Sequence, residues 1–117
     1  MIETFVTAPV QLQERIQART ARVGILGLGY VGLPLALLFS EKGFPVTGFD
    51  IDRKKVDMLN SGKSYIVRIP PEEIAPARER GFTATGDFSE IAKMDAIIIC
   101  VPTPAMSGID APRIVRA

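Results

Sequence analysis

The stretch RVGILGLGYVGLPLALLFSEKG, residues 22–43, decides the fold of this chain of 117 residues. It begins with a short apolar run that ends in glycines, which is typical of a buried strand. Residues 30–42 are long enough for a helix and apolar almost all round, and Gly43 is placed to end that helix. Pro34 lies near the first turn, where a missing N–H costs least. The stretch therefore predicts a strand, a tight glycine turn and a buried helix.

Short apolar runs and helical segments continue to alternate along the rest of the chain. The expected strands are residues 22–28, 45–50, 82–85 and 95–101. The expected helices are residues 10–19, 30–42, 53–59, 71–80, and a short one that begins after Asp87 or Ser89 and ends near residue 93. Such alternation implies right-handed βαβ crossovers. The sequence therefore predicts an α/β fold with a Rossmann-type doubly wound parallel sheet of about four strands, in the order 3-2-1-4.

The composition indicates one globular domain and excludes several classes of function. Hydrophobic residues make up 47% and charged residues 23% of the chain, and the net charge is +1. No dense basic run is present, so nucleic-acid binding is not expected. With no histidine and one cysteine, the chain has neither Ser–His nor Cys–His catalysis nor an internal disulfide. No targeting signal and no apolar run of ~18 residues is visible, so we expect a cytoplasmic protein without a membrane span.

Residues 27–32, GLGYVG, match the pattern G-x-G-x-x-G. The pattern alone is common, but here it follows an expected strand directly and opens an expected helix. In that context Gly27 permits the tight turn, Gly29 lets the backbone approach a pyrophosphate, and Gly32 lets the helix pack closely on the strand. The free N–H groups at the start of the helix would face the phosphates.

An acidic residue at the end of the next strand completes the pattern. Asp50 lies about 20 residues beyond the glycine loop, where a carboxylate would accept hydrogen bonds from the adenosine ribose. Asp52 is expected to cap the following helix rather than to contact a ligand. Lys55 fits a solvated helix face and a position toward the adenosine equally well. Strand, loop, helix, strand and acid together predict a dinucleotide-binding site.

Short motifs in a fixed order extend this pattern well beyond the glycine loop. The motifs are GLGYVGLPLA at residues 27–36, GFDID at 48–52, KV at 55–56, LNSG at 59–62, SYI at 64–66 and IICVPTP at 98–104. On these motifs, residues 22–104 resemble the N-terminal NAD-binding domain of the UDP-glucose/GDP-mannose dehydrogenase family. The SYI motif and the proline-bearing loop after it look most like the branch of UDP-N-acetylglucosamine 6-dehydrogenases, which oxidise UDP-N-acetylhexosamines at C6.

The resemblance implies a reaction and a set of cofactor-binding residues. That set is Gly27, Leu28, Gly29, Tyr30, Val31, Gly32, Asp50, Lys55, Val101, Pro102 and Thr103. Tyr30 and Val31 would lie against the pyrophosphate, residues 50 and 55 at the adenosine ribose, and residues 101–103 at the nicotinamide ribose. Enzymes of the family oxidise the primary alcohol of a nucleotide sugar to a carboxylate in two NAD-dependent steps, through a covalent intermediate on a cysteine.

The sequence departs from the family beyond the NAD-binding part. The nucleophilic cysteine and the UDP-sugar domain of the family have no counterpart here, so we expect a truncated chain that binds NAD and holds no catalytic or metal-binding residue. Cys100, in an apolar strand, is expected to be a buried, inert hydrophobe. The expected divisions are an N-terminal helical extension at 1–20, the NAD-binding domain at 21–104 and a divergent tail at 105–117.

Two other functions stay open beside the NAD-binding part of an oxidoreductase. One is a non-catalytic NAD-binding or oligomerising module derived from the same domain. The other is a flavin-binding protein with the same glycine loop, against which the VPTP and SYI motifs argue. The expected strand order makes residues 95–101 an outer strand that is apolar on both faces, and such an edge pairs readily with another chain. We therefore expect a homodimer, formed across this edge or across the uncovered helix faces, unless the N-terminal helix covers the surface.

Overall fold

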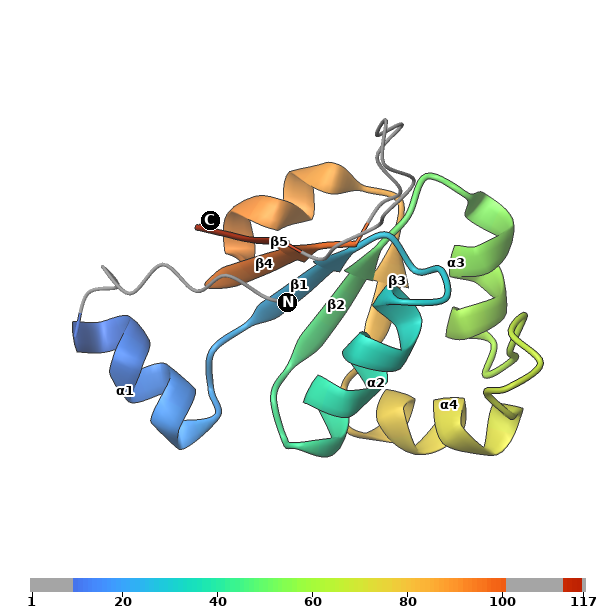
Figure 1. Cartoon of the computed structure of the whole chain (residues 1–117), viewed down its shortest axis with the longest axis horizontal. Helices are drawn as coiled ribbons and strands as arrows, with labels where there is room; N and C mark the ends of the chain where they lie inside the picture. Colours follow the sequence, from blue (N-terminus) through green and yellow to red (C-terminus); the bar gives the residue numbers. More distant parts are fainter. Residues whose placement is uncertain (1–9, 101–112, 117) are drawn as a thin grey trace.

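The structure, a computed structural model, describes residues 10–100 and 113–116 and has one sheet flanked by helices (Figure 1). The elements are α1 (Val10–Ala18), β1 (Val23–Leu26), α2 (Gly32–Glu41), β2 (Val46–Phe49), α3 (Arg53–Asn60), α4 (Pro71–Glu79), β3 (Thr83–Thr85), the 3-10 helix η1 (Phe88–Lys93), β4 (Ala96–Ile99) and β5 (Arg113–Arg116). The first four strands are parallel and lie in the order β3-β2-β1-β4, which confirms the predicted Rossmann-type fold.

The strand register brings the carboxyl ends of three strands to one level. Leu26 at the end of β1 lies opposite Phe49 of β2 on one side and Ile99 of β4 on the other. Backbone hydrogen bonds continue this pairing one residue further, because the Gly27 N–H donates to the Phe49 carbonyl and the Cys100 N–H to the Leu26 carbonyl. The loops that follow β1, β2 and β4 therefore meet at the same edge of the sheet.

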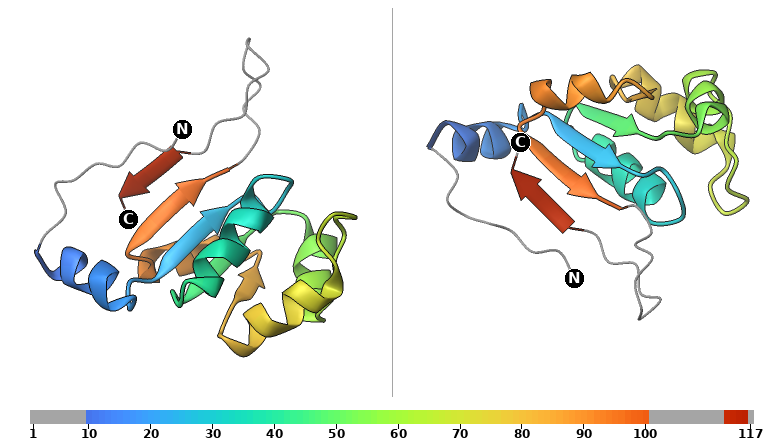
Figure 2. Two further views of the ribbon diagram at one scale, coloured as in Figure 1. Left: turned by 60° about the horizontal axis from the view of Figure 1, so that its bottom comes forward. Right: turned by 90° about the horizontal axis from the view of Figure 1, so that it is seen from above.

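A fifth strand lies beside β4, at the position where the sequence predicted an open edge. β5 is antiparallel to β4, with Arg113 opposite Ile99 and Arg116 opposite Ala96 (Figure 2). The expectation that residues 95–101 form the outer strand is therefore wrong, since part of the expected divergent tail is a strand. Its hydrogen bonds satisfy the backbone groups of β4 that would otherwise be unpaired. Because β5 occupies this edge, the reason for expecting a homodimer across it no longer holds. A dimer through the helix faces stays a prediction.

Helices cover both faces of the sheet, as the crossover directions require. Val23 and Ile25 of β1 belong to one buried cluster with Leu33 and Ala36 of α2. The opposite face carries Phe49, whose ring centroid lies 5.9 Å from that of Phe88 in η1. Figure 2 shows α2 and η1 on opposite sides of the strands. The connection after β1, which contains α2, and the connection before β4, which contains η1, therefore cover opposite faces of the sheet. They diverge between the neighbouring strands β1 and β4.

The helix ends follow the local signals in the sequence. Asp52 caps α3 through a hydrogen bond of 3.0 Å that its side chain accepts from the Lys54 N–H, which confirms its expected capping role. Asp87 caps η1 by accepting the Ser89 N–H. Gly43 adopts a φ of +95° just after α2, a conformation that favours glycine. These caps fix where each helix begins and ends relative to the sheet.

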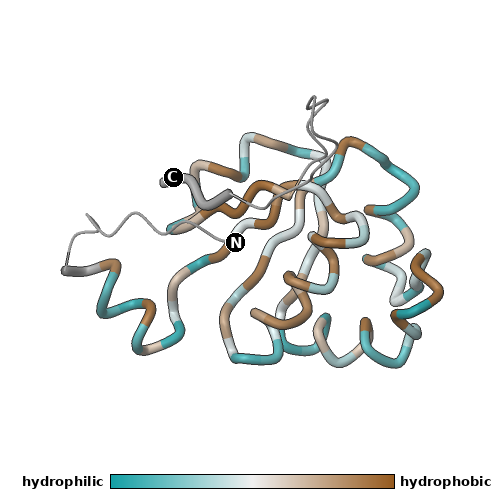
Figure 3. The backbone as a smooth tube through the Cα atoms, in the orientation of Figure 1, coloured by the Kyte–Doolittle hydropathy of each residue, from teal (hydrophilic) through white to brown (hydrophobic). Residues whose placement is uncertain are grey.

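The N-terminal helix α1 lies apart from the other helices and is tied to the sheet by charge. Arg15 forms an ion pair of 2.6 Å with Asp95, which also accepts the Arg22 N–H. Hydrophobic residues concentrate in the strands and α2, while α1 is largely hydrophilic (Figure 3). Among the described residues, no helix has the length and apolar character that a membrane crossing requires.

Removing residues 113–117 should increase self-association, because the outer backbone groups of β4 would lose their partners in β5. Light scattering at micromolar concentration measures the effect, and the whole chain is the control. The shortened chain should show a higher mean mass that rises with concentration. Equal masses for the two chains would mean that β5 does not protect this edge.

Candidate functional site

A cleft of about 650 Å³ opens at the carboxyl end of the sheet. The residues that line this cleft are Leu26, Gly27, Leu28, Gly29, Tyr30, Val31, Phe49, Asp50, Ile51, Lys55, Phe88 and Cys100. It lies where the crossovers after β1 and before β4 diverge, the position at which doubly wound sheets bind ligands. Its volume falls within the range of small-molecule and cofactor sites.

The first and third glycines of the loop are required by the protein itself. Gly27 has a φ of +94°, in the left-handed region that favours glycine. A Cβ on Gly32 would lie 1.6 Å from the Gly27 carbonyl oxygen, so any larger residue would push α2 away from the end of β1. Both predicted roles, the tight turn and the close helix packing, are visible in this geometry.

Gly29 is different, because nothing in the described structure requires a glycine there. Its φ is not among the positive values, and a Cβ built at this position meets no atom within 4 Å. Gly29 lines the cleft, so an added methyl group would occupy space that is open to a ligand. The absence of a side chain at Gly29 therefore leaves room for a ligand and serves no need of the protein's own packing.

The start of α2 offers an environment that suits an anion. Its N-cap residue is Val31, and no side chain accepts a hydrogen bond from the first turn. The aligned peptide dipoles of a helix place about half a positive charge at this end. Because the loop from Gly29 to Val31 lines the cleft, a phosphate group bound there would meet backbone N–H groups and favourable charge.

Asp50 is held in place by two backbone groups. Its Oδ2 accepts the Leu28 N–H at 2.9 Å, and its Oδ1 accepts the Asp52 N–H at 2.8 Å. Each carboxylate oxygen has two lone pairs, so each retains an acceptor site after these bonds are made. The carboxylate is therefore oriented in advance and can still accept two hydroxyl groups, as a ribose would offer.

Lys55 and Tyr65 lie together beside the glycine loop. The Lys55 Nζ lies 5.6 Å from the centroid of the Tyr65 ring, within the range of a cation–π interaction. Lys55 is half-buried and lines the cleft, so it does not lie on a fully solvated helix face, and its position toward the adenosine stays a prediction. The Tyr65 hydroxyl donates a hydrogen bond of 2.5 Å to the Leu28 carbonyl. This link had no counterpart among the predicted site residues.

The Tyr65 hydroxyl stays protonated over the physiological range. Burial, and next the negative charges of Asp50 and Asp52, raise its pKa above the ordinary value. The folded state holds this proton more tightly than the unfolded chain does. The contribution of the proton to the free energy of unfolding is therefore fully present below pH about 10 and is lost as the pH rises above it. Tyr65 is therefore a constant hydrogen-bond donor near neutral pH.

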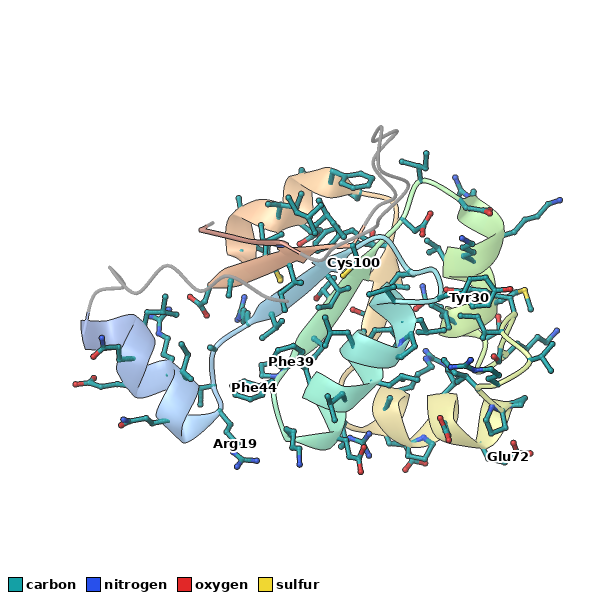
Figure 4. The ribbon with its side chains drawn as sticks, viewed as in Figure 1. Arg19, Tyr30, Phe39, Phe44, Glu72 and Cys100 are labelled. Carbon is teal, nitrogen blue, oxygen red and sulfur yellow. The ribbon has the colours of Figure 1, made fainter. Side chains whose placement is uncertain are left out.

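Cys100 lies in the cleft wall rather than in the interior of a strand. β4 ends at Ile99, so Cys100 emerges at the carboxyl end of the sheet and is only half-buried, which contradicts the expected full burial. Figure 4 shows Cys100 above Phe39 and Phe44 and to the left of Tyr30. Burial raises the pKa of the Cys100 thiol, which lowers its thiolate fraction and its reactivity.

The structure brings most of the predicted site together. Residues 27–31, Asp50 and Lys55 line one cleft, and Gly32 packs behind them on Gly27. Val101, Pro102 and Thr103 lie outside the described residues.

Five residues that line the cleft were not among the predicted cofactor-binding residues: Leu26, Phe49, Ile51, Phe88 and Cys100. Ile51 is 89% exposed, and Phe88 of η1 contacts Phe49 on the face of the sheet opposite α2. Their signals were weak but present: Ile51 directly follows the strand-end acid, and Phe88 follows the cap of η1. In residues 10–100 and 113–116 no group of acidic, histidine or cysteine side chains is arranged to hold a metal ion.

Known proteins resemble this chain in sequence. GDP-mannose 6-dehydrogenase from Pseudomonas syringae pv. tomato is 42% identical over 95 residues, which cover 76% of this chain and 21% of that protein. UDP-N-acetyl-D-glucosamine 6-dehydrogenase from Salmonella typhi is 40% identical over 83 residues, covering 71% of this chain and 19% of that protein. The chain thus spans about a fifth of the length of these relatives, whose names include both GDP- and UDP-linked sugars.

Solved structures and a family model agree with these relatives. GDP-mannose dehydrogenase from Pseudomonas aeruginosa matches with a TM-score of 0.63 at 34% identity, over 77% of this chain and 22% of that one. UDP-D-ManNAc dehydrogenase from Pyrococcus horikoshii matches with a TM-score of 0.61 at 34% identity, over 74% of this chain and 21% of that one. The model of the UDP-glucose/GDP-mannose dehydrogenase family, NAD binding domain, matches residues 21–112, and this chain therefore belongs to that family.

Proposed function

We propose that the chain binds NAD across the cleft at the carboxyl end of the sheet. The observation that carries this proposal is Gly29, whose missing side chain serves no need of the fold and leaves the cleft open. The pyrophosphate lies over Gly29 at the start of α2, between Tyr30 and Val31. The adenosine ribose bonds to the remaining acceptor sites of Asp50, with Lys55 beside it. Residues 101–103 accompany the nicotinamide ribose.

The chain's own residues bind and orient the cofactor in this proposal. NAD, when bound, supplies the hydride acceptor for oxidation of an alcohol. The backbone N–H groups of the glycine loop hold the pyrophosphate, and Asp50 fixes the ribose. The apolar side chains of Ile51 and Phe88 line the cleft beside Asp50. We assign no catalytic role to any residue between positions 10 and 100. The Cys100 thiol is poorly suited to such a role because burial raises its pKa.

The wider reaction is that of a nucleotide-sugar 6-dehydrogenase, in which a primary alcohol of the sugar becomes a carboxylate. Support comes from the family match and from relatives named for this reaction on GDP-mannose and UDP-N-acetylglucosamine. Among these sugars we propose a UDP-N-acetylhexosamine, on the basis of the SYI motif at residues 64–66. The catalytic cysteine and the sugar-binding residues belong to the part of those relatives that this chain does not match.

Gly29→Ala should weaken NAD binding without harming the fold. The added methyl group meets no protein atom but enters the space proposed for the pyrophosphate, so the NAD affinity should fall at least tenfold. The free energy of unfolding should stay within about 0.5 kcal/mol of the unmodified chain, as for a surface substitution. Isothermal titration calorimetry and urea denaturation measure the two quantities.

Gly32→Ala is the matched control, because its Cβ would collide with the Gly27 carbonyl oxygen. This variant should lose several kcal/mol of stability or fail to fold. A Gly29→Ala chain that binds NAD as tightly as the unmodified chain would contradict the proposed position of the pyrophosphate.

NAD should bind at least tenfold more tightly than NADP. The 2′-phosphate of NADP would place two like charges close together at the Asp50 carboxylate, although Arg53, Lys54 and Lys55 nearby reduce the repulsion. Asp50→Ala should weaken NAD binding and narrow the difference between the two cofactors. Titration of both cofactors into both chains tests this, and tighter binding of NADP by the unmodified chain would refute it.

The chain of 117 residues should not turn over substrate on its own. Covalent oxidation of this kind needs an activated thiolate within reach of the sugar, and burial keeps the single thiol of the chain, Cys100, protonated. Incubation with NAD and UDP-N-acetylglucosamine should give no increase in NADH absorbance. Steady NADH formation that disappears in Cys100→Ser would disprove both the inert role of Cys100 and the need for a further domain.

A further inference from the structure

Leu28, the residue between the first two glycines of the loop, is held at three points. Its N–H donates to Asp50 at 2.9 Å, and its carbonyl accepts the Tyr65 hydroxyl. Its side chain is fully buried above β2, where a Cβ on Gly48 would lie 2.6 Å from the Leu28 Cδ2. Both backbone polar groups and the side chain of one loop residue are therefore fixed by other segments.

Tyr65 comes from a distant but well-anchored segment, the connection between α3 and α4. It lies 37 residues from Leu28 in the chain. The neighbouring Ser64 hydroxyl donates to the Ile66 carbonyl at 3.0 Å and accepts the Ile66 N–H at 3.2 Å. Ile66 and Ile69 are buried in the main core, and the Ile69 N–H donates to the Ile66 carbonyl. Tyr65 therefore meets the glycine loop from a rigid support.

Tyr65 acts from outside the cleft. It does not line the cleft but a neighbouring hollow of about 370 Å³, which it shares with Gly29, Tyr30 and Lys55. The Tyr65 hydroxyl meets the glycine loop at the Leu28 carbonyl, whereas the Tyr65 ring lies beside Lys55, which lines both spaces. Replacement of Tyr65 by Phe keeps the ring beside Lys55, so it changes only the contact of the hydroxyl with the glycine loop.

A glycine loop without such support would lose affinity for entropic reasons. Gly27 and Gly29 flank Leu28, and glycine has the largest conformational freedom of any residue. A free loop would have to be ordered when the ligand binds, and this ordering would reduce the binding free energy. The bonds of Leu28 order the loop during folding instead, before any ligand arrives.

We propose that Tyr65 is a positioning residue for the cofactor, whose hydroxyl holds the Leu28 carbonyl and so presents the loop N–H groups to the pyrophosphate. This inference rests on the proposed function, because it assigns Tyr65 to the same NAD site. The ligand group concerned is the diphosphate, since the adenosine end is held by the Asp50 side chain.

Tyr65→Phe tests this role, because it removes the hydroxyl and retains the ring. The affinity for NAD should fall about 5- to 10-fold, the loss expected for one neutral hydrogen bond. Adenosine, which lacks the diphosphate, should bind as it does to the unmodified chain. Calorimetry measures NAD binding, and chemical-shift titration measures the weaker binding of adenosine.

Ser61→Ala is the matched control, because it removes a hydroxyl of the connection between α3 and α4 that donates to the Asp57 carbonyl of α3 rather than to the glycine loop or to the segment around Tyr65. Its NAD affinity should be unchanged. Gly48→Ala is a second, independent variant, because its Cβ would displace the Leu28 side chain and leave the Tyr65 hydroxyl intact. It should also weaken NAD binding more than adenosine binding.

The outcomes distinguish the two proposals. An unmodified chain that binds no NAD would overturn the proposed function itself. If the unmodified chain binds NAD and Tyr65→Phe binds it equally well, only the role of Tyr65 is overturned. Equal losses for NAD and adenosine would also overturn it, because they would reflect a general structural defect.

Discussion

The close approach of α2 to the end of β1 is the constraint on which the rest of the structure depends. A Cβ on Gly32 would lie 1.6 Å from the Gly27 carbonyl oxygen, so only glycine lets the helix begin at this height. Because α2 begins there, its apolar side packs on β1 and β2, with Leu33 and Ala36 in the core. The same contact turns the positive end of the helix toward the cleft. The core packing of α2 and the orientation of its positive end toward the cleft are consequences of one backbone contact.

The parallel register extends this arrangement to the neighbouring strands. Leu26 lies level with Phe49 and Ile99, so the residues after three strands emerge at one edge. Asp50 can therefore reach the Leu28 N–H directly, and the carboxylate closes the glycine loop against β2. A shift of β2 by one residue would move this carboxylate to the other face of the sheet. The site thus depends on the register of the sheet as much as on the glycines.

Local sequence patterns predicted those features whose causes lie within a few neighbouring residues. The glycine loop, the strand-end Asp50 and the capping Asp52 belong to this class, because turn chemistry and capping act over short distances. β5 was missed because its four residues, RIVR, carry almost no pattern and gain their structure only by pairing with β4. The Tyr65 bond was missed because only the fold brings it to Leu28. Cys100 was placed too deep because the end of β4 could not be fixed from an unbroken apolar run.

Asp50 shows why folding and recognition overlap at this site. Both of its carboxylate oxygens already accept backbone N–H groups, so the side chain holds the loop together whether or not a ligand is present. A ligand that uses the remaining lone pairs binds only the folded loop and therefore stabilises the folded chain in proportion to its occupancy. Loss of Asp50 would remove a support of the loop and a ligand contact together. Gly29 and the Tyr65 hydroxyl separate these contributions, because Gly29 affects only the space for the ligand and the hydroxyl bonds only to the loop.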